Sequence, residues 1–292
     1  MENKYYKYCL NTYQKEYSRC YVALRSKKKM GTLSPKKAEE FDREAQKSAI
    51  RIAFIKALQK YPDEPVSELW SAIYRAHLFR KSGISDLETI SKVISADQSW
   101  KKSSGHAFEE MVKELASLAL YDTGVEIILQ RDLNTLIKAN ELANEPRDIS
   151  WLKEQIKANI FDLYGILTID DKKYCFGCVQ AKTSIRDRVT RDREPSIHAM
   201  DSFFWSVVFV LDGDFLRLPK FASMINGGSE EFRENGWHGM YVLSQEKANL
   251  GRIYPLTMDF DIFKSHALQA AEQWQKRRQW FDNKWIADDS AK

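Results

Sequence analysis

The sequence predicts an α/β domain that follows an all-helical N-terminal part, with the boundary near residue 100. Residues 34–103 show helical patterns and no strand-like run, whereas residues 125–182 contain three short strand-like runs. The 292 residues include 43% hydrophobic and 12% aromatic side chains, enough to bury a large core. We therefore expect a helical domain over residues 1–100 and an α/β domain over residues 101–292.

Three amphipathic helices are expected in the N-terminal part. Pro35 suits the first turn of the first helix, and Pro62 ends it. Ser85 and Glu88 stand in capping-box positions at the start of the third helix. The expected helices cover residues 34–62, 67–79 and 85–103.

The α/β part alternates helical and strand-like patterns. Asp170 and Asp171 form a turn between the second and third expected strands, so these two strands should be neighbours. Pro195 is expected at the start of a largely buried helix. The expected strands cover residues 125–130, 159–169, 172–182 and 239–244, and the expected helices cover residues 106–121, 195–211 and 263–281.

Charge and hydropathy exclude several classes of protein. Lysine, arginine, aspartate and glutamate make up 29% of the chain, yet the net charge is only +4, so any nucleic-acid surface must be local. The longest apolar run, residues 203–211, is far shorter than the roughly 20 residues that span a bilayer. The polar start "MENKYYKYCL" lacks a signal-peptide core. We expect a cytoplasmic protein with no membrane partner.

The four cysteines raise the question of a zinc site. Cys175 and Cys178 form a CxxC pattern, but no second such pair or closely spaced histidine pair accompanies it. The surrounding segment is strand-like, and residues three apart on a strand point to opposite faces. We expect buried free cysteines. The five histidines likewise show no metal-ligand spacing.

The candidate catalytic residues lie on the expected hairpin. Asp162 and Lys182 are twenty positions apart and meet at one region of the sheet if the two strands pair. Metal-assisted hydrolysis of a phosphodiester needs carboxylates that hold Mg²⁺ and suits a lysine that orients the nucleophile. A single carboxylate provides too few ligands for a metal site, so others are required. The candidates are Glu109, Glu110, Asp192 and Glu194.

The stretch "VQAKTSIRDRVTRDRE", residues 179–194, combines five basic and three acidic residues. Within it, Arg186, Asp187 and Arg188 form a triplet suited to reading base edges. An arginine pairs bidentately with guanine O6 and N7, and a carboxylate accepts from cytosine N4. The alternative is a solvated helix start with ordinary ion pairs.

These residues resemble the PD-(D/E)xK nucleases, and within them the type II restriction endonucleases that cut CCGG-type sites. Most of the superfamily has an acid two residues before the lysine, where this chain has Gln180. The CCGG group moves that acid beyond the lysine, which matches Glu194 or, as the alternative, Asp192. It also places a glutamate on an upstream helix, matching Glu109, and a reading triplet after the lysine. The resemblance covers roughly residues 100–245, although "FDLY" lacks the usual proline before the aspartate.

The resemblance implies a restriction-endonuclease-like core, in which helices flank a central mixed β-sheet. It implies a homodimer, or a higher oligomer on double-stranded DNA, that uses Mg²⁺ bound by Asp162, Glu194 and Glu109. The expected site is a palindrome containing CCGG, T/CCGGA or W/CCGGW, cut to leave four-base 5′ overhangs. Lys102 would contact DNA, and a cognate DNA methyltransferase would belong to the same system.

Two other functions remain open at this point. A structure-specific repair or resolving nuclease of the same fold would cut by DNA shape and would have little use for the reading triplet. A non-catalytic DNA-binding protein would explain Gln180 as the mark of a decayed site. The N-terminal helices would serve dimerisation or contacts with flanking DNA.

Overall fold

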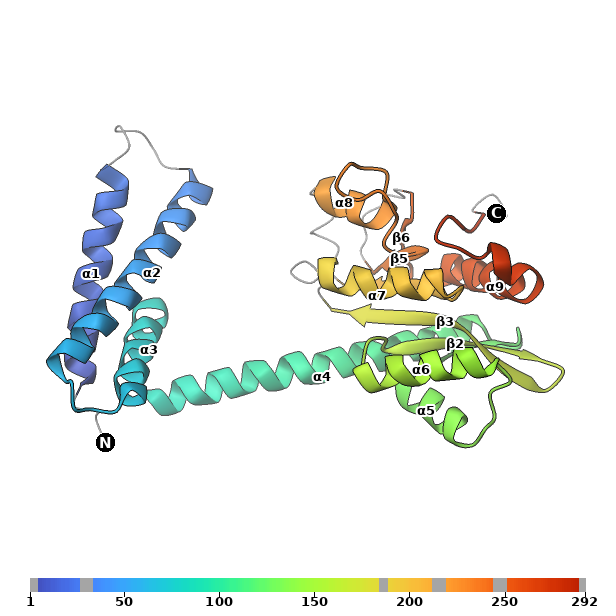
Figure 1. Cartoon of the computed structure of the whole chain (residues 1–292), viewed down its shortest axis with the longest axis horizontal. Coiled ribbons are helices and arrows are strands. Elements are labelled where there is room, and N and C mark those ends of the chain that lie inside the picture. The colour runs from blue at the N-terminus through green and yellow to red at the C-terminus, as the bar shows by residue number, and fades with distance from the viewer. Residues whose placement is uncertain (1–4, 27–33, 184–188, 212–218, 244–250, 289–292) are drawn as a thin grey trace. The chain divides into compact units, whose positions relative to one another are not determined.

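The computed structural model describes residues 5–26, 34–183, 189–211, 219–243 and 251–288, with only the backbone of Leu87, Lys101 and Lys102. The chain divides into two compact units, Met1–Ser99 and Trp100–Lys292 (Figure 1). The helix α4 (Leu87–Ala119) contributes residues to both units.

The N-terminal unit is helical, as the sequence predicts. The helix α1 (Tyr6–Ser26) packs against both α2 (Pro35–Lys60) and α3 (Val66–Ser82). The buried face of α2 presents alanines at every fourth position, and such small side chains allow the three backbones to approach closely. These alanines are Ala45, Ala49, Ala53 and Ala57.

The predicted break between two helices near residue 104 is wrong, because α4 runs without interruption through it. Ser103, Ser104 and Gly105 lower helix propensity but remove no backbone hydrogen bond, unlike proline. The helix begins after Asp86, whose Oδ2 accepts from the Thr89 amide at 2.8 Å. None of the helices in the described ranges combines the length and the apolar character that crossing a membrane requires.

The C-terminal unit contains a mixed sheet of six strands in the order β1 to β6. The pairs β1–β2 and β2–β3 are antiparallel, and β3 to β6 run parallel to one another. The predicted α/β class with a mixed sheet is therefore confirmed. The strands are β1 (Val125–Leu129), β2 (Leu163–Ile169), β3 (Lys172–Lys182), β4 (Trp205–Val210), β5 (Gly239–Val242) and β6 (Ile253–Pro255).

Helices cover both faces of this sheet (Figure 1). The second half of α4 and the helix α9 share one hydrophobic cluster with the strands. The helices α5 to α8 contribute to two clusters that involve other strand residues. The helices are α5 (Gln130–Lys138), α6 (Pro146–Ala158), α7 (Val189–Asp201), α8 (Pro219–Asn226) and α9 (Asp261–Arg277), followed by the short 3₁₀ helix η2 (Arg278–Trp280).

The hairpin that positions the candidate catalytic residues is present as predicted. Ile169 of β2 pairs with Lys172 of β3, so Asp170 and Asp171 alone form the turn. Both have positive φ, 46° and 62°, as a two-residue hairpin turn of type I′ requires. The turn sets the register near Ile169, and a β-bulge between Gly165 and Ile166 shifts the pairing by one residue towards the open end of the hairpin.

The helix predicted over residues 195–211 is wrong in its second half. The helix α7 begins earlier, at Val189, with Pro195 inside it, and ends at Asp201. After Phe203, whose φ is 62°, the chain continues as the strand β4. All residues of β4 are buried, because it pairs with parallel neighbours on both sides, so it lacks the alternating pattern of a half-exposed strand.

Cys175 and Cys178 are free and buried on β3, as predicted. Burial raises the pKa of both thiols, which keeps them protonated. In the described part of the chain, these cysteines form no metal cluster. They pack in the core between β3 and the helices α5 and α6.

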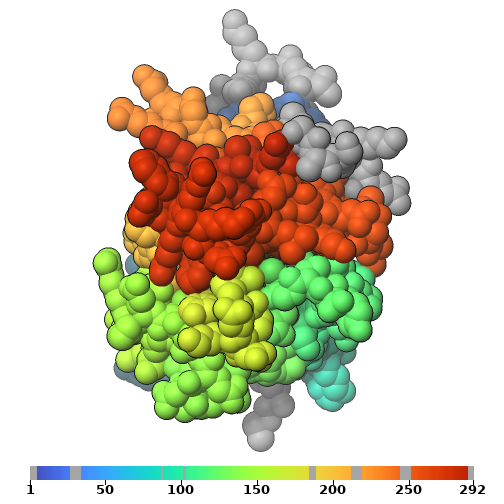
Figure 2. All heavy atoms as spheres, turned by 90° about the vertical axis from the view of Figure 1, so that its right-hand side faces the viewer, coloured from blue at the N-terminus to red at the C-terminus, as the bar shows by residue number. Residues whose placement is uncertain are grey.

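A partly buried ion pair joins the C-terminal segment to α6. Arg278 donates from both Nη atoms to the Asp148 carboxylate, at 2.7 Å each, and stacks over Trp274. Figure 2 shows the C-terminal segment (red) above the 130–158 region (light green), with both exposed on the face towards the viewer. The side chain of Asp148 is only 8% exposed and that of Arg278 is 26% exposed.

We expect Arg278→Ala to lower the free energy of unfolding by about 2–3 kcal/mol, because it leaves the Asp148 carboxylate buried without its partner. Urea unfolding followed by circular dichroism measures this. Lys276→Ala is the matched control: its partner Glu272 is fully exposed, so stability should stay near the wild-type value. Equal losses in both variants would show that the Arg278–Asp148 pair contributes no more to stability than an exposed ion pair.

His238 makes folding dependent on pH. Its Nδ1 accepts from the Ser206 amide at 3.0 Å, so its Nε2 carries the proton and contacts the Asp282 carbonyl at 2.8 Å. Burial lowers the pKa of His238 to about 3, whereas an unfolded histidine titrates near 6.5. Between these values only the unfolded chain takes up a proton. Stability is therefore retained above pH 6.5 and falls as the pH drops towards 3.

When the pH is lowered from 6.5 to 5, the titration of His238 should lower the free energy of unfolding by about 2 kcal/mol. Unfolding in urea at both pH values measures the difference. His238→Asn should remove most of it, whereas replacement of the exposed His198 by asparagine should leave it unchanged. The same pH dependence in His238→Asn would contradict the assignment.

Candidate active site

A pocket of about 500 Å³ opens at the ends of β2 and β3 and contains four of the predicted site residues. These four residues are Glu109, Asp162, Lys182 and Asp192. They come from α4, the start of β2, the end of β3 and the first turns of α7. We call this hollow the candidate pocket; the rest of its lining includes Gly105, Asn159, Gln180, Thr183 and Arg191.

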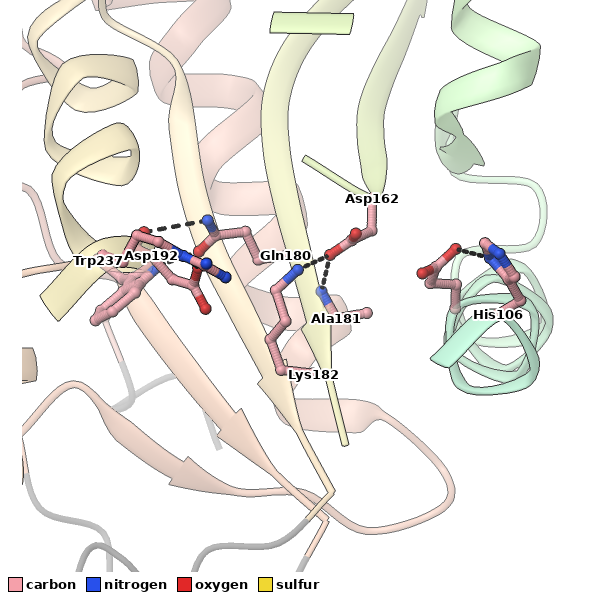
Figure 3. Close-up of polar contacts among 9 residues, drawn as sticks. His106, Asp162, Gln180, Ala181, Lys182, Asp192 and Trp237 are labelled. Atoms are coloured by element: carbon pink, nitrogen blue, oxygen red, sulfur yellow. Dashed lines mark hydrogen bonds and ion pairs between the residues drawn. The ribbon is translucent and has the colours of Figure 1, made fainter. Parts of the chain in front are cut away.

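Asp162 and Lys182 are in direct contact. The Lys182 Nζ lies 2.7 Å from Asp162 Oδ2, and the Ala181 amide donates to the same oxygen at 2.7 Å (Figure 3). The backbone of Asp162 extends the β2–β3 ladder through a bond from its amide to the Val179 carbonyl, at 3.0 Å. The strand pairing therefore brings the two side chains together, while Asp162 Oδ1 takes part in neither side-chain contact.

Glu109 faces the same pocket from α4. Its Oε2 lies 3.3 Å from Nδ1 of the exposed His106 (Figure 3). Burial raises the pKa of the Glu109 carboxyl, and the nearby Asp162 carboxylate raises it further, while His106 and Lys182 lower it. The mutual repulsion of Glu109 and Asp162 is what a bound cation would relieve.

Asp192 lines the candidate pocket from α7 and is buried, at 8% exposure. Its Oδ2 is buried and has no hydrogen-bond partner among the described residues. Its Oδ1 lies 3.6 Å from Nε of Arg191, a largely exposed side chain at the edge of the same pocket. A buried carboxylate oxygen without a donor is costly unless a cation compensates it.

Glu194 lies elsewhere. It is exposed and lines a neighbouring hollow together with Glu154, His198 and Asp201. Residues two apart on a helix are separated by about 200° around its axis, so Asp192 and Glu194 face different directions. The structure thus brings Asp192, and not Glu194, to the pocket that holds Asp162 and Lys182.

Gln180 occupies the position two residues before the lysine and is 1% exposed. Its Oε1 accepts from the indole Nε1 of Trp237 at 2.9 Å, and its Nε2 donates to the Asp192 carbonyl at 3.1 Å (Figure 3). Sequence reasoning missed this role because Trp237 is 57 positions away, and no spacing pattern links the two residues.

The donor set suits a hard cation. Within the described residues, no three histidine, cysteine, aspartate or glutamate side chains form a closed metal cluster. Mg²⁺ needs no such cluster, because it keeps several waters and binds through one or two carboxylates together with substrate phosphates. The carboxylates of the pocket offer oxygen ligands, and Asp192 Oδ2 has no hydrogen-bond partner among the described residues. Both observations fit this mode of binding.

The predicted reading triplet, Arg186, Asp187 and Arg188, lies outside the described residues, as does the side chain of Lys102. Of the remaining basic residues in this stretch, Arg193 has a structural role. It donates to the carbonyls of Met224, at 3.0 Å, and Glu234, and its partial burial lowers the pKa of its guanidinium. Arg193 is thus occupied by backbone carbonyls.

A family model described as "BsaWI restriction endonuclease type 2" matches residues 145–280. Among solved structures, the chain is similar to the pre-specific restriction endonuclease BsaWI–DNA complex, with 51% sequence identity and a TM-score of 0.83 over 98% of this chain and 99% of that chain. A specific restriction endonuclease AgeI–DNA complex matches with 19% identity and a TM-score of 0.45 over 89% of this chain and 91% of that chain. No curated protein matches the sequence.

Proposed function

Since this chain belongs to the BsaWI family of type II restriction endonucleases, and is therefore a site-specific deoxyribonuclease, we propose that it hydrolyses double-stranded DNA at a palindromic CCGG-containing site with the help of Mg²⁺. The observation that supports this reaction is the candidate pocket itself. It brings the Asp162–Lys182 pair together with Asp192, a buried carboxylate that has an unpartnered oxygen.

Asp162 and Asp192 are the proposed metal ligands, with Glu109 as a further one. Restriction endonucleases of this family use divalent metal ions, and Mg²⁺ is the one proposed here. When bound, the ion supplies Lewis-acid polarisation of the scissile phosphate and acidifies a coordinated water. Among the carboxylates predicted beyond the lysine, we favour Asp192 over Glu194 because only Asp192 lines the candidate pocket.

Lys182 is proposed to orient the attacking water and to offset charge on the phosphate. Its ammonium has three donors, and the contact with Asp162 holds it in place with one of them. Because its side chain is only 14% exposed, bulk water screens its charge weakly. A fixed and poorly screened positive charge favours the developing negative charge of the transition state.

Sequence recognition is assigned to Arg186, Asp187 and Arg188, which follow Lys182 by four to six residues. Each good bidentate arginine–guanine contact contributes about 1–3 kcal/mol of discrimination. The proposed site is T/CCGGA or W/CCGGW, with cleavage before the first C and four-base 5′ overhangs. Lys102 is proposed as an additional DNA contact.

The proposed partners follow from a palindromic site. A two-fold dimer reads both half-sites with the same residues, so we propose a homodimer or a higher oligomer on DNA. The DNA of the host needs protection at the same site, which implies a cognate methyltransferase in the cytoplasm. The N-terminal unit is proposed to serve dimerisation or flanking contacts, since none of its described residues lines the candidate pocket.

The test is digestion of phage DNA with and without Mg²⁺, followed by sequencing of the ends. We expect uniform ends within CCGG-containing sites and no cleavage without the metal ion. Ends at junctions or at random positions would instead indicate a structure-specific nuclease. Specific binding without any cleavage would indicate a non-catalytic protein.

A further inference from the structure

We propose that Gln180 and Trp237 act as a positioning pair, which holds the backbone of Asp192 so that its carboxylate can bind the catalytic cation. The inference rests on the proposed function of Asp192 as a metal ligand. Such a role would explain why residue 180 is a glutamine, at a position where a carboxylate is more usual in this superfamily.

The side chain of Gln180 lies beside the reacting groups. Gln180 and Lys182 are two residues apart on β3, so both side chains point to the same face of the sheet, and both line the candidate pocket. Yet both polar atoms of the Gln180 amide have partners, since Trp237 donates to Oε1 and the Asp192 carbonyl accepts from Nε2. Gln180 is therefore engaged in supporting Asp192 instead of holding a cation directly.

Trp237 provides a rigid base for this contact. It is fully buried and packs in a cluster with Val189 of α7 and Val208 of β4. Its own carbonyl accepts from Asn235 Nδ2 at 2.9 Å. A large aromatic side chain that is fixed in this way can neither rotate nor shift without opening the cluster. The indole N–H consequently has one available direction, which is towards Gln180.

Arg193, which follows Asp192 on α7, is held against the segment that precedes Trp237. Arg193 donates to the carbonyls of Met224 and Glu234, and its side chain passes so close to Gly236 that a Cβ there would lie 2.9 Å from Arg193 Cγ. The first turns of α7 are thus fastened at two consecutive residues, by Gln180 at position 192 and by Arg193 itself. This fixes the rotation of the helix and the direction of the Asp192 side chain.

Only an amide satisfies both partners of residue 180. A glutamate would accept from the Trp237 indole but would place a second acceptor against the Asp192 carbonyl. A leucine of similar volume would leave the Trp237 indole N–H buried without its acceptor and would remove the side-chain donor from the Asp192 carbonyl, which is costly. Gln180 is therefore matched to the pair of neighbours that the fold gives it, and Asp192 supplies the carboxylate that residue 180 does not.

The test compares Gln180→Leu and Trp237→Phe with the wild-type full-length chain. Binding of Mn²⁺ alone is measured from the electron paramagnetic resonance signal of the free ion, and the Mg²⁺ concentration for half-maximal DNA cleavage is measured in parallel. Loss of a residue that orients a metal ligand typically lowers metal affinity about 10–100-fold. We expect Mn²⁺ affinity to fall about tenfold in both variants, the Mg²⁺ requirement to rise by a similar factor, and metal-free DNA binding to stay within about twofold.

Trp274→Phe is the matched control. Trp274 is also buried, at 8% exposure, but its indole N–H has no hydrogen-bond partner among the described residues. The same chemical change there removes no contact with the pocket, so Mn²⁺ affinity should stay at the wild-type value. Equal losses in Trp237→Phe and Trp274→Phe would overturn the proposal, because they would reflect general loosening of the core.

Asp192→Asn in the same Mn²⁺ titration separates the two levels of inference. If Asp192→Asn loses Mn²⁺ affinity while Gln180→Leu and Trp237→Phe retain it, the positioning pair is refuted and the metal ligand stands. If Asp192→Asn binds Mn²⁺ as the wild type does, the ligand assignment is wrong and the positioning pair is refuted with it. Should Gln180→Leu fail to fold, the milder Trp237→Phe, which keeps the Gln180 donor, decides between these outcomes.

Discussion

Lys182→Ala is expected to lower the rate of DNA cleavage by about 10²–10⁴-fold while specific DNA binding is retained. The Lys182 ammonium is held 2.7 Å from Asp162 at the edge of the candidate pocket, where it can meet the attacking water and the phosphate. The proposed recognition residues lie at other positions, so the variant should still bind its site. Single-turnover cleavage with Mg²⁺ and gel-shift binding without it measure the two properties.

Lys173→Ala provides the control on the same strand. The Lys173 side chain is 39% exposed, its Nζ lies 3.9 Å from Glu126, and it does not line the candidate pocket. It removes the same charge from β3, so any general effect of charge on DNA affinity appears in both variants. Wild-type turnover by Lys182→Ala would refute the proposed mechanism, whatever the effect on binding.

Asp192→Asn should slow cleavage strongly, whereas Glu194→Gln should cut at close to the wild-type rate. The first change removes the charge of the buried carboxylate whose Oδ2 has no partner among the described residues. The second neutralises an exposed carboxylate that lies in the neighbouring hollow, two residues along the same helix. The size of the first effect should be at least the 10–100-fold typical of changes to a metal site.

The two variants also show whether Asp192 acts as a specific metal ligand or only through its negative charge. Both substitutions remove one negative charge from α7 and preserve side-chain size, so altered attraction to DNA affects them equally. Cleavage rates are measured over a Mg²⁺ titration, because a lost ligand raises the metal requirement. The reverse result, with Glu194→Gln inactive and Asp192→Asn active, would show that α7 rotates when DNA binds and that Glu194 is the ligand.

The Asp162–Lys182 contact was predictable from the sequence because local rules determine it. Two strand-like runs flank a two-residue turn, and the positive φ values of Asp170 and Asp171 give the hairpin its register. Two paired strands bring residues twenty positions apart to the open end of the hairpin. The turn does not reveal the β-bulge between Gly165 and Ile166, which shifts the pairing there by one residue. The α/β class and the helical N-terminal part followed similarly from hydrophobic periodicity.

Two other features did not follow from the local sequence patterns. The run around Val207 was expected to be helical because burial on both faces of β4 removes the alternation that reveals a strand. The continuity of α4 through Gly105 likewise contradicted the local signal of a break. For β4, tertiary packing outweighed the local pattern. The helix α4 continues because Ser103, Ser104 and Gly105 each cost no more than about 1 kcal/mol of helix propensity and remove no backbone hydrogen bond.

By itself, the sequence supplied the candidate residues of the proposed site: an aspartate, a lysine and acidic residues beyond it, with Gln180 where an acid is more usual. Only the tertiary structure decided which carboxylate meets the Asp162–Lys182 pair, because Asp192 and Glu194 differ by a rotation of α7. We propose that this rotation depends on Trp237, which donates to Gln180 from 57 residues further along the chain. Spacing along a helix is a local property, but the direction in which the helix faces is decided by the distant residues that pack against it.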